Sequence, residues 1–226
     1  MGTAEKQMIP APGEPEGRTD EPLRLAEELL ISRGRNRLCY HHPYDPALVV
    51  KVPAGPDKTQ VDANAREYRG YQDLVRRHGM ISCISHCHGF VATDRGPGLL
   101  CDCVRNEDGS PAETIWDLIV HHEECDLPSI LAVAEAFCQH LVAHDIRLFD
   151  LNPKNIALRQ CRNGTYAAVA LDLKGRFDNN EFIPFSTYSR YFARRKLVRR
   201  SRQLLDRIVL YRQNRHRYQH LFQPPE

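Results

Sequence analysis

The chain has 226 residues, a length that suits one compact domain or two small lobes sharing a cleft. Hydrophobic residues make up 42% and charged residues 27% of the sequence, a balance that is typical of globular proteins and excludes a disordered or collagen-like chain. No stretch has the roughly 20 apolar residues that a membrane-spanning helix requires. The formal net charge of +2 identifies no class of partner by itself.

The first 22 residues carry four prolines among several acidic residues and almost no bulky apolar side chain. This composition predicts a disordered tail. The tail also lacks the basic start and apolar run of a secretory signal, so we expect a cytoplasmic protein. In a reducing compartment the eight cysteines are expected to be thiols rather than disulfides.

Residues 23–104 show the signals of a small antiparallel β-sheet with one helix. Alternating or β-branched runs predict strands at 25–31, 38–40, 47–52, 87–93 and 98–104. Between the third and fourth of these, residues 62–77 place apolar side chains at helical spacing, with Asp62 as a candidate N-cap. We therefore expect the helix to pack on the sheet.

Residues 105–226 are predicted to form a mostly helical second lobe, which begins at the polar loop 105–111. Helices are expected at 114–123 and 128–144. Two short strands, 155–159 and 165–171, flank Asn163-Gly164, a strong signal for a hairpin turn. From about Ser186 the sequence is helical and very basic. The predicted class is thus α+β, with a sheet-containing first lobe and a compact helical second lobe.

The most informative segment is Asp150-Leu151-Asn152-Pro153-Lys154-Asn155. The hairpin that follows is expected to fold the chain back and bring Asp172 close to Asp150 and Asn155. Two carboxylates and an amide oxygen would suit Mg²⁺, which takes its other ligands from water and substrate phosphates. Lys51, on a buried strand, is the obvious cation for those phosphates, and a metal with a lysine is what phosphoryl transfer requires.

In the order and spacing of these residues, the sequence resembles the protein-kinase-like superfamily and, within it, the YrbL family of the PhoP regulatory network. The resemblance covers roughly residues 25–210 and implies a two-lobed kinase-like fold that uses ATP and Mg²⁺. It implies that Asp150 is the catalytic base and that Asn155 and Asp172 hold the metal. Lys51 and Glu67 would pair at the nucleotide, beneath a phosphate loop that contains Gly34. Backbone groups of residues 102–104, from Asp102 to Val104, would meet the adenine edge.

Each of these residues also has a structural interpretation. The Asp150 segment fits an Asx turn, Lys51 a solvated strand residue, Glu67 a surface charge on a helix, and Asp172 the end of a strand. What favours the kinase-like interpretation is that all of them occur in the expected order.

Departures from the kinase pattern leave the activity open. Only Gly34 remains of three glycines in the phosphate loop, where Arg35 and Arg37 could contact phosphate instead. Leu148-Phe149 replaces the His-Arg before the catalytic aspartate, and Lys154 lies two residues after the position where protein kinases have lysine. The alternative is therefore a pseudokinase-like module that binds nucleotide or a regulatory partner.

The resemblance also implies a setting in envelope or Mg²⁺-responsive regulation in a Gram-negative bacterium. The expected partners are a nucleotide and an acceptor hydroxyl, which could belong to a sugar, a lipopolysaccharide intermediate or a protein. The short chain after Asp172 leaves little room for a platform that binds a protein substrate, and this favours a small acceptor.

Two further clusters have both a functional and a structural interpretation. Zinc could bind Cys83, His86, Cys87 and His88 together with Cys101 and Cys103. The spacing matches no Cys-x₂-Cys pair, however, and strand alternation places Cys101 and Cys103 on one face with no requirement that Cys87 join them, so buried thiols are preferred.

The basic segment 190–217 forms an amphipathic pattern with an apolar stripe. It could dock on an anionic membrane surface or an acidic partner, peripherally at the inner membrane, or simply pack on its lobe with arginines in water. Nucleic acid is not the expected partner.

Overall fold

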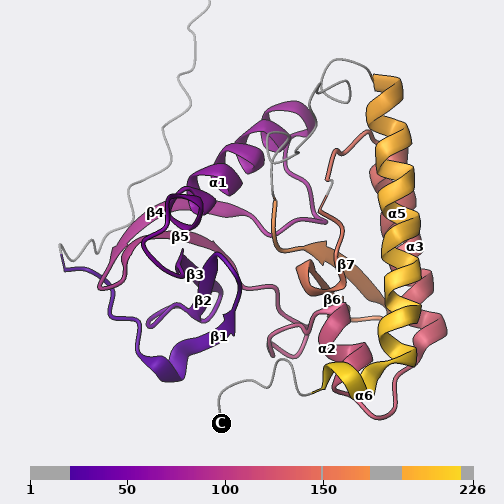
Figure 1. Cartoon of the computed structure of the whole chain (residues 1–226), viewed down its shortest axis with the longest axis horizontal. Helices are drawn as coiled ribbons and strands as arrows, with labels where there is room; N and C mark the ends of the chain where they lie inside the picture. Colours follow the sequence, from indigo (N-terminus) through magenta and orange to yellow (C-terminus); the bar gives the residue numbers. More distant parts are fainter. Residues whose placement is uncertain (1–20, 149, 174–189, 220–226) are drawn as a thin grey trace, which may run out of the picture.

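The structure is a computed structural model that describes residues 21–148, 150–173 and 190–219 (Figure 1). The predicted disordered tail lies outside the described residues except for its last two positions. Within the described part of the chain, no helix is long and apolar enough to cross a membrane.

A five-stranded antiparallel sheet forms the first part of the molecule. Its strands are β1 (Leu30–Arg33), β2 (Arg37–His41), β3 (Leu48–Pro53), β4 (Cys87–Thr93) and β5 (Gly96–Asp102), in the spatial order β1-β2-β3-β5-β4. The predicted meander of three strands and the later hairpin are therefore confirmed. The strand predicted at 25–31 begins later, because Glu27–Leu29 forms a 3₁₀ turn that exposes its two glutamates.

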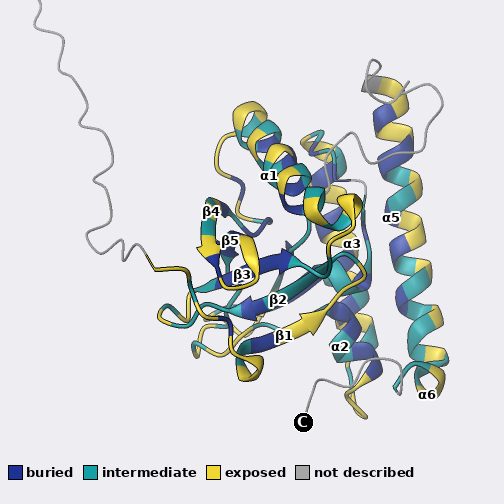
Figure 2. Cartoon of the chain, turned by 60° about the vertical axis from the view of Figure 1, so that its left-hand side comes forward, coloured by how far each residue is buried: buried dark blue, intermediate teal, exposed yellow. Residues whose placement is uncertain are grey.

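Helix α1 (Lys58–His78) lies across the sheet (Figure 2) and begins four residues before the predicted start. Asp57 is the residue at the N-cap position and Asp62 lies inside the helix, so the predicted cap is wrong. The helix buries Asn64, Glu67, Gly70 and Leu74. Because the Asn64 amide donates a 2.7 Å hydrogen bond to the carbonyl oxygen of Lys51, one turn of α1 is fixed against the middle of β3.

The second part is mostly helical. It contains α2 (Ile115–Val120), α3 (Leu127–Ala143), α5 (Arg190–Gln213) and α6 (Arg215–Tyr218), with α5 packed along α3 (Figure 1). A capping box between Thr114 and Asp117 starts α2. Between α3 and α5 a 3₁₀ turn (Pro153–Asn155) leads into the hairpin of β6 (Ile156–Gln160) and β7 (Tyr166–Ala170). The α+β class is confirmed.

The two parts are joined at the end of this hairpin. The segment between α1 and β4 runs beside β7, where the Ser85 N–H donates to the Ala170 carbonyl over 2.8 Å and the Ala170 N–H donates to the Cys83 carbonyl over 2.9 Å. Ile81 and Ile84 of the same segment belong to the apolar core of the helical part. This junction fixes the position of the chain that follows β7 relative to the sheet.

Candidate active site

A buried ion pair connects β3 and α1. The Lys51 ammonium lies 2.7 Å from Oε1 of Glu67, and the two residues are only 8% and 1% exposed. Burial opposes the charged form of Lys51, but the attraction of Cys101, Glu67 and Asp172 outweighs it, so the pKa of Lys51 is raised. Lys51 is therefore a permanent cation at the α1 face of the sheet, and the pairing with Glu67 is as the resemblance predicts.

Arg37, the first residue of β2, adds a second cation to this pair. Its guanidinium binds the other carboxylate oxygen of Glu67 and also lies 2.8 Å from Oδ2 of Asp172. Burial acts against the charge here too, but Glu67 and Asp172 more than compensate, and the pKa of Arg37 is raised. The resulting cluster, Lys51, Arg37, Glu67 and Asp172, balances two positive and two negative charges.

Leu171 links this charged cluster to the Asp150 segment. Its carbonyl oxygen accepts a 2.6 Å hydrogen bond from the Lys51 ammonium. Its N–H donates over 2.8 Å to the carbonyl oxygen of Asn155. The chain just before Asp172 therefore touches both the lysine of the first part and the asparagine of the second.

The Asp150 segment is held in shape by its own side chains. The Asn152 side chain accepts from the Lys154 N–H, which caps the 3₁₀ turn at Pro153. Nδ2 of Asn155 donates to Oδ2 of Asp150 over 3.5 Å. The backbone of Asn155 thus lies beside Leu171, the neighbour of Asp172, and its side chain lies beside Asp150. The amide oxygen of Asn155 is the atom of this side chain that would bind a cation.

Gly34 lies in the turn between β1 and β2, which is only three residues long. Its N–H donates to the Arg37 carbonyl over 2.8 Å, and a Cβ at this position would lie 3.1 Å from the same oxygen. Glycine therefore relieves crowding inside a tight turn. Arg37, predicted as a phosphate contact, is instead bound to Glu67 and Asp172 in this structure.

The backbone of Asp102 is bound by the two residues that precede β4. Its N–H donates to the His86 carbonyl over 2.9 Å, and its carbonyl accepts from the Ser85 hydroxyl over 3.0 Å. The Val104 carbonyl accepts from the Ala112 N–H over 2.8 Å. These backbone groups would have to exchange their present partners for the edge of an adenine ring. The assignment of Asp102 and Val104 to adenine binding therefore stays a prediction.

Lys154 points toward α2. Its ammonium lies 4.0 Å from the centre of the Trp116 ring, a cation–π contact. Burial lowers the pKa of Lys154, although the Asp117 carboxylate acts in the opposite direction. Trp116 is thus a neighbour of the Asp150 segment that the sequence analysis did not identify.

The cysteine and histidine cluster does not assemble as one zinc site in the described residues. All eight cysteines are free thiols. The imidazole of His86 lies 3.4 Å from the Tyr71 hydroxyl and that of His88 lies 2.6 Å from Asp102. Cys87, which alternation did not place with Cys101, lies directly opposite it, because a register shift after Cys87 changes the alternation along β4.

The basic segment divides into buried and exposed parts. Leu197, Leu204 and Ile208 of α5 are buried, which confirms the predicted apolar stripe. Arg212 donates to the Ile119, His122 and Glu123 carbonyls at the end of α2, and Arg215 binds the latter two as well. Other arginines of α5 are exposed, among them Arg194, Arg195, Arg199 and Arg202, so docking on an anionic surface stays a prediction.

An antiparallel sheet covered by one helix, with a buried lysine–glutamate pair between them, is followed by a mostly helical second part. This is the arrangement of a kinase-like fold.

The chain belongs to the family described as PhoP regulatory network protein YrbL, whose model matches residues 23–209. It is 28% identical to YrbL of Escherichia coli (strain K12) over 181 residues. The aligned part covers 78% of this chain and 83% of that protein, and the values are the same for YrbL of Shigella flexneri. Among solved structures, the crystal structure of Rad53 1-466 in complex with AMP-PNP matches with a TM-score of 0.42 and 15% identity, over 64% of this chain and 37% of that one.

Proposed function

We propose that this protein is an ATP- and Mg²⁺-dependent phosphotransferase that acts on a hydroxyl acceptor. The observation that carries the proposal is the buried cluster in which Lys51 and Glu67 meet the end of β7. Lys51 contacts both the Glu67 carboxylate, over 2.7 Å, and the Leu171 carbonyl, over 2.6 Å. This contact joins residues that are 120 positions apart in sequence, and it supports a binding site here for a phosphate chain and its metal.

The donors at this site fit Mg²⁺. The Asp172 carboxylate and the Asn155 amide oxygen are hard ligands of the kind that Mg²⁺ prefers, and Leu171 couples their backbones through its bond to Asn155. When bound, the metal would neutralise charge on the transferred phosphate. In this structure Oδ2 of Asp172 accepts from Arg37, so a metal ion on this oxygen requires Arg37 to share or release it.

The side chains of the protein have separate tasks in this proposal. Lys51, kept extended by Glu67, donates to the nucleotide phosphates. Asp150 orients the acceptor hydroxyl and takes its proton, a role typically worth about 10²–10⁴ in rate. Asn155 binds Asp150 through its amide nitrogen, which keeps the carboxylate beside the metal site. Arg37 becomes free to contact phosphate oxygens once it leaves Asp172.

We propose that the acceptor is small, such as a sugar or a lipopolysaccharide intermediate. The family description ties its members to the PhoP regulatory network, and we extend to this chain a role in envelope or Mg²⁺-responsive regulation.

Nucleotide binding is tested by thermal unfolding with ATP, with and without Mg²⁺. A ligand that binds only the folded state adds about 2.7 kcal/mol of stability at a hundred times its dissociation constant, so the midpoint must rise. Asp172→Asn should abolish the Mg²⁺-dependent part of the rise. Asp73→Asn, which changes a carboxylate on the surface of α1, should keep it. An unchanged rise in Asp172→Asn would remove Asp172 from the metal site.

Chemistry is tested by phosphate release from ATP. Asp150→Asn should lower the rate by about 10²-fold or more while leaving the thermal shift intact. Equal rates in the parent protein and the variant would exclude Asp150 as the base.

A second candidate function is a pseudokinase-like regulatory module. It is favoured by the Arg37–Asp172 pair, in which a side chain of the protein already supplies positive charge at the metal-binding carboxylate. This candidate predicts a thermal shift that ATP produces without Mg²⁺, and no phosphate release in either the parent protein or Asp150→Asn.

A further inference from the structure

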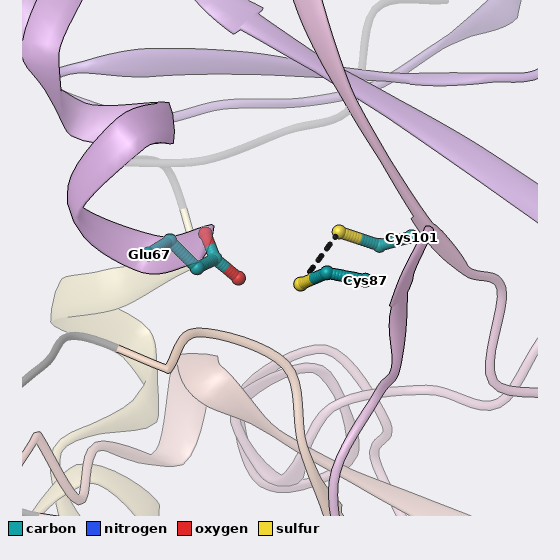
Figure 3. Close-up of side chains that lie close together, drawn as sticks. All are labelled: Glu67, Cys87 and Cys101. Carbon is teal, nitrogen blue, oxygen red and sulfur yellow. Dashed lines mark hydrogen bonds between the residues drawn. The ribbon is translucent and has the colours of Figure 1, made fainter. Parts of the chain in front are cut away.

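Two thiols face each other beneath α1, on the edge strand β4 and its neighbour β5. Cys87 of β4 and Cys101 of β5 are direct partners in the antiparallel register, and their sulfur atoms are 3.5 Å apart (Figure 3). Their exposed fractions are 5% and 0%. A Glu67 carboxylate oxygen lies within 4.8 Å of both sulfur atoms. The proposed phosphotransferase reaction uses neither thiol.

A metal ion is the first chemistry to consider for two thiols and a carboxylate. Here, however, one oxygen of Glu67 accepts from Lys51 and the other from Arg37. A divalent cation would have to displace these partners and would be repelled by both permanent positive charges. The two sulfur atoms alone do not complete a zinc site. The surroundings therefore favour chemistry between the thiols.

The backbone already has the geometry that a disulfide needs. Partners in an antiparallel pair have Cα atoms about 4.5–5.5 Å apart, inside the range of about 4.4–6.8 Å found across disulfides. A modest side-chain rotation would therefore bring the sulfur atoms from 3.5 Å to the bonded distance of about 2.05 Å. The sheet need not open for the bond to form.

The two thiols also differ in acidity. A hydrogen bond joins the two sulfur atoms, and this bond, with help from Lys51 and against the effect of burial, lowers the pKa of Cys101. The same hydrogen bond, together with burial, raises the pKa of Cys87. This difference favours Cys101 as the attacking thiol and Cys87 as the resolving thiol.

We propose that Cys87 and Cys101 form a reversible disulfide when the protein meets a small peroxide. The Cys101 thiolate attacks one oxygen of hydrogen peroxide, breaks the O–O bond and becomes a sulfenic acid, while the other oxygen leaves as hydroxide and is protonated to water. The Cys87 sulfur then attacks the sulfenic sulfur, and its S–H proton leaves with the hydroxyl group as a second water. In sum, two thiols and one peroxide give one disulfide and two waters, and a dithiol reductant reverses the change.

Burial restricts this reaction to a small oxidant and places its product next to the Glu67 carboxylate. The new bond would tie β4 to β5 and remove the S–H···S hydrogen bond below α1. The disulfide would form whether or not the protein transfers phosphate, so the experiment needs no enzymatic activity.

The experiment uses the full chain, reduced and freed of reductant, then exposed to hydrogen peroxide. Remaining thiols are alkylated in denaturant, and peptides are mapped by mass spectrometry with and without reduction. The expected result is a linked peptide pair that joins Cys87 to Cys101, restored to two alkylated cysteines by dithiothreitol. Cys87→Ser and Cys101→Ser should each abolish the pair, and Cys138→Ser, a buried cysteine of α3, should retain it.

Two results would overturn the proposal. One is alkylation of both Cys87 and Cys101 at peroxide levels that oxidise the partly exposed Cys161. The other is stoichiometric zinc in the untreated protein that both serine variants lose. Since the mapping is done on the parent protein, it decides the matter even if a serine variant fails to fold.

Discussion

The guanidinium of Arg37 lies 2.8 Å from Oδ2 of Asp172 and also binds Glu67. A residue of β2 is thereby joined to a residue just after the β6–β7 hairpin, across the two parts of the molecule. The contact gives a positive partner to the buried Glu67 carboxylate and to the partly buried Asp172 carboxylate. Arg37 must share or release Oδ2 of Asp172 if that oxygen is to bind a cation.

Replacing Arg37 by methionine should destabilise the fold. Glu67 keeps Lys51 as a partner, but one of its oxygens and the Asp172 carboxylate lose a charged donor, which we expect to cost about 1–3 kcal/mol. Urea denaturation measures the change in the free energy of unfolding. Arg33→Met is the control, because Arg33 pairs with Glu27 at the surface, where ion pairs contribute about 0–1 kcal/mol. An equal decrease in the free energy of unfolding in both variants would show that the ion pairs of Arg37 add no more stability than a surface pair.

Trp116 should report on the Asp150 segment. It is the one tryptophan of the chain, and the Lys154 ammonium lies 4.0 Å from its ring centre. Lys154→Met should change the emission spectrum and lower stability by about 0.5–2 kcal/mol. Arg159→Met, on the exposed end of β6, should leave the emission unchanged. A spectrum that is identical in Lys154→Met would mean that the cation does not rest on the ring in solution.

Arg212 should matter more for stability than an exposed arginine of the same helix. It donates to three carbonyls at the end of α2, at 2.7–3.2 Å. Arg212→Gln should therefore lower the free energy of unfolding by about 1.5–3 kcal/mol, the usual range for hydrogen bonds to a charged group. Arg194→Gln, which alters an exposed residue, should change it by less than about 0.5 kcal/mol. Urea unfolding of the two variants gives the comparison directly.

The exposed arginines of α5 should bind anionic vesicles. Each basic residue near such a surface contributes about 1 kcal/mol, so changing Arg194, Arg195, Arg199 and Arg202 to glutamine should weaken binding by about 10³-fold. Co-sedimentation with vesicles of phosphatidylglycerol at physiological salt is the measurement, and neutral phosphatidylcholine vesicles are the control. If the parent protein binds neither kind, the arginines serve only as a solvated face.

Asp126 should give α3 a pH-dependent start. The hydroxyl and backbone N–H of Ser129 both donate to this carboxylate and lower its pKa. The folded state therefore favours the ionised form, and this stabilisation is complete above the unfolded pKa of about 4 and lost as pH falls through the lower folded value. Asp126→Asn keeps a capping oxygen but removes the charge. Its deficit in the free energy of unfolding relative to the parent protein should be present at pH 7 and vanish near pH 2, whereas a constant deficit would contradict this role.

The sequence by itself determined the order of most elements, because hydrophobic periodicity and turn chemistry are local. The strand at 87–93 and the Asn163-Gly164 hairpin were predicted in this way, and Lys51, Glu67, Asp150, Asn155 and Asp172 were singled out by their order along the chain.

Only the tertiary structure decided which groups meet. For Arg37 the sequence left open a contact with phosphate, and in the structure its side chain binds Glu67 and Asp172. Cys87 lies opposite Cys101 only because of a register shift in β4. The backbone groups of Asp102 form hydrogen bonds with Ser85 and His86. Such contacts depend on strand register and on the packing of segments that are distant in sequence. No local pattern of residues indicates either of them.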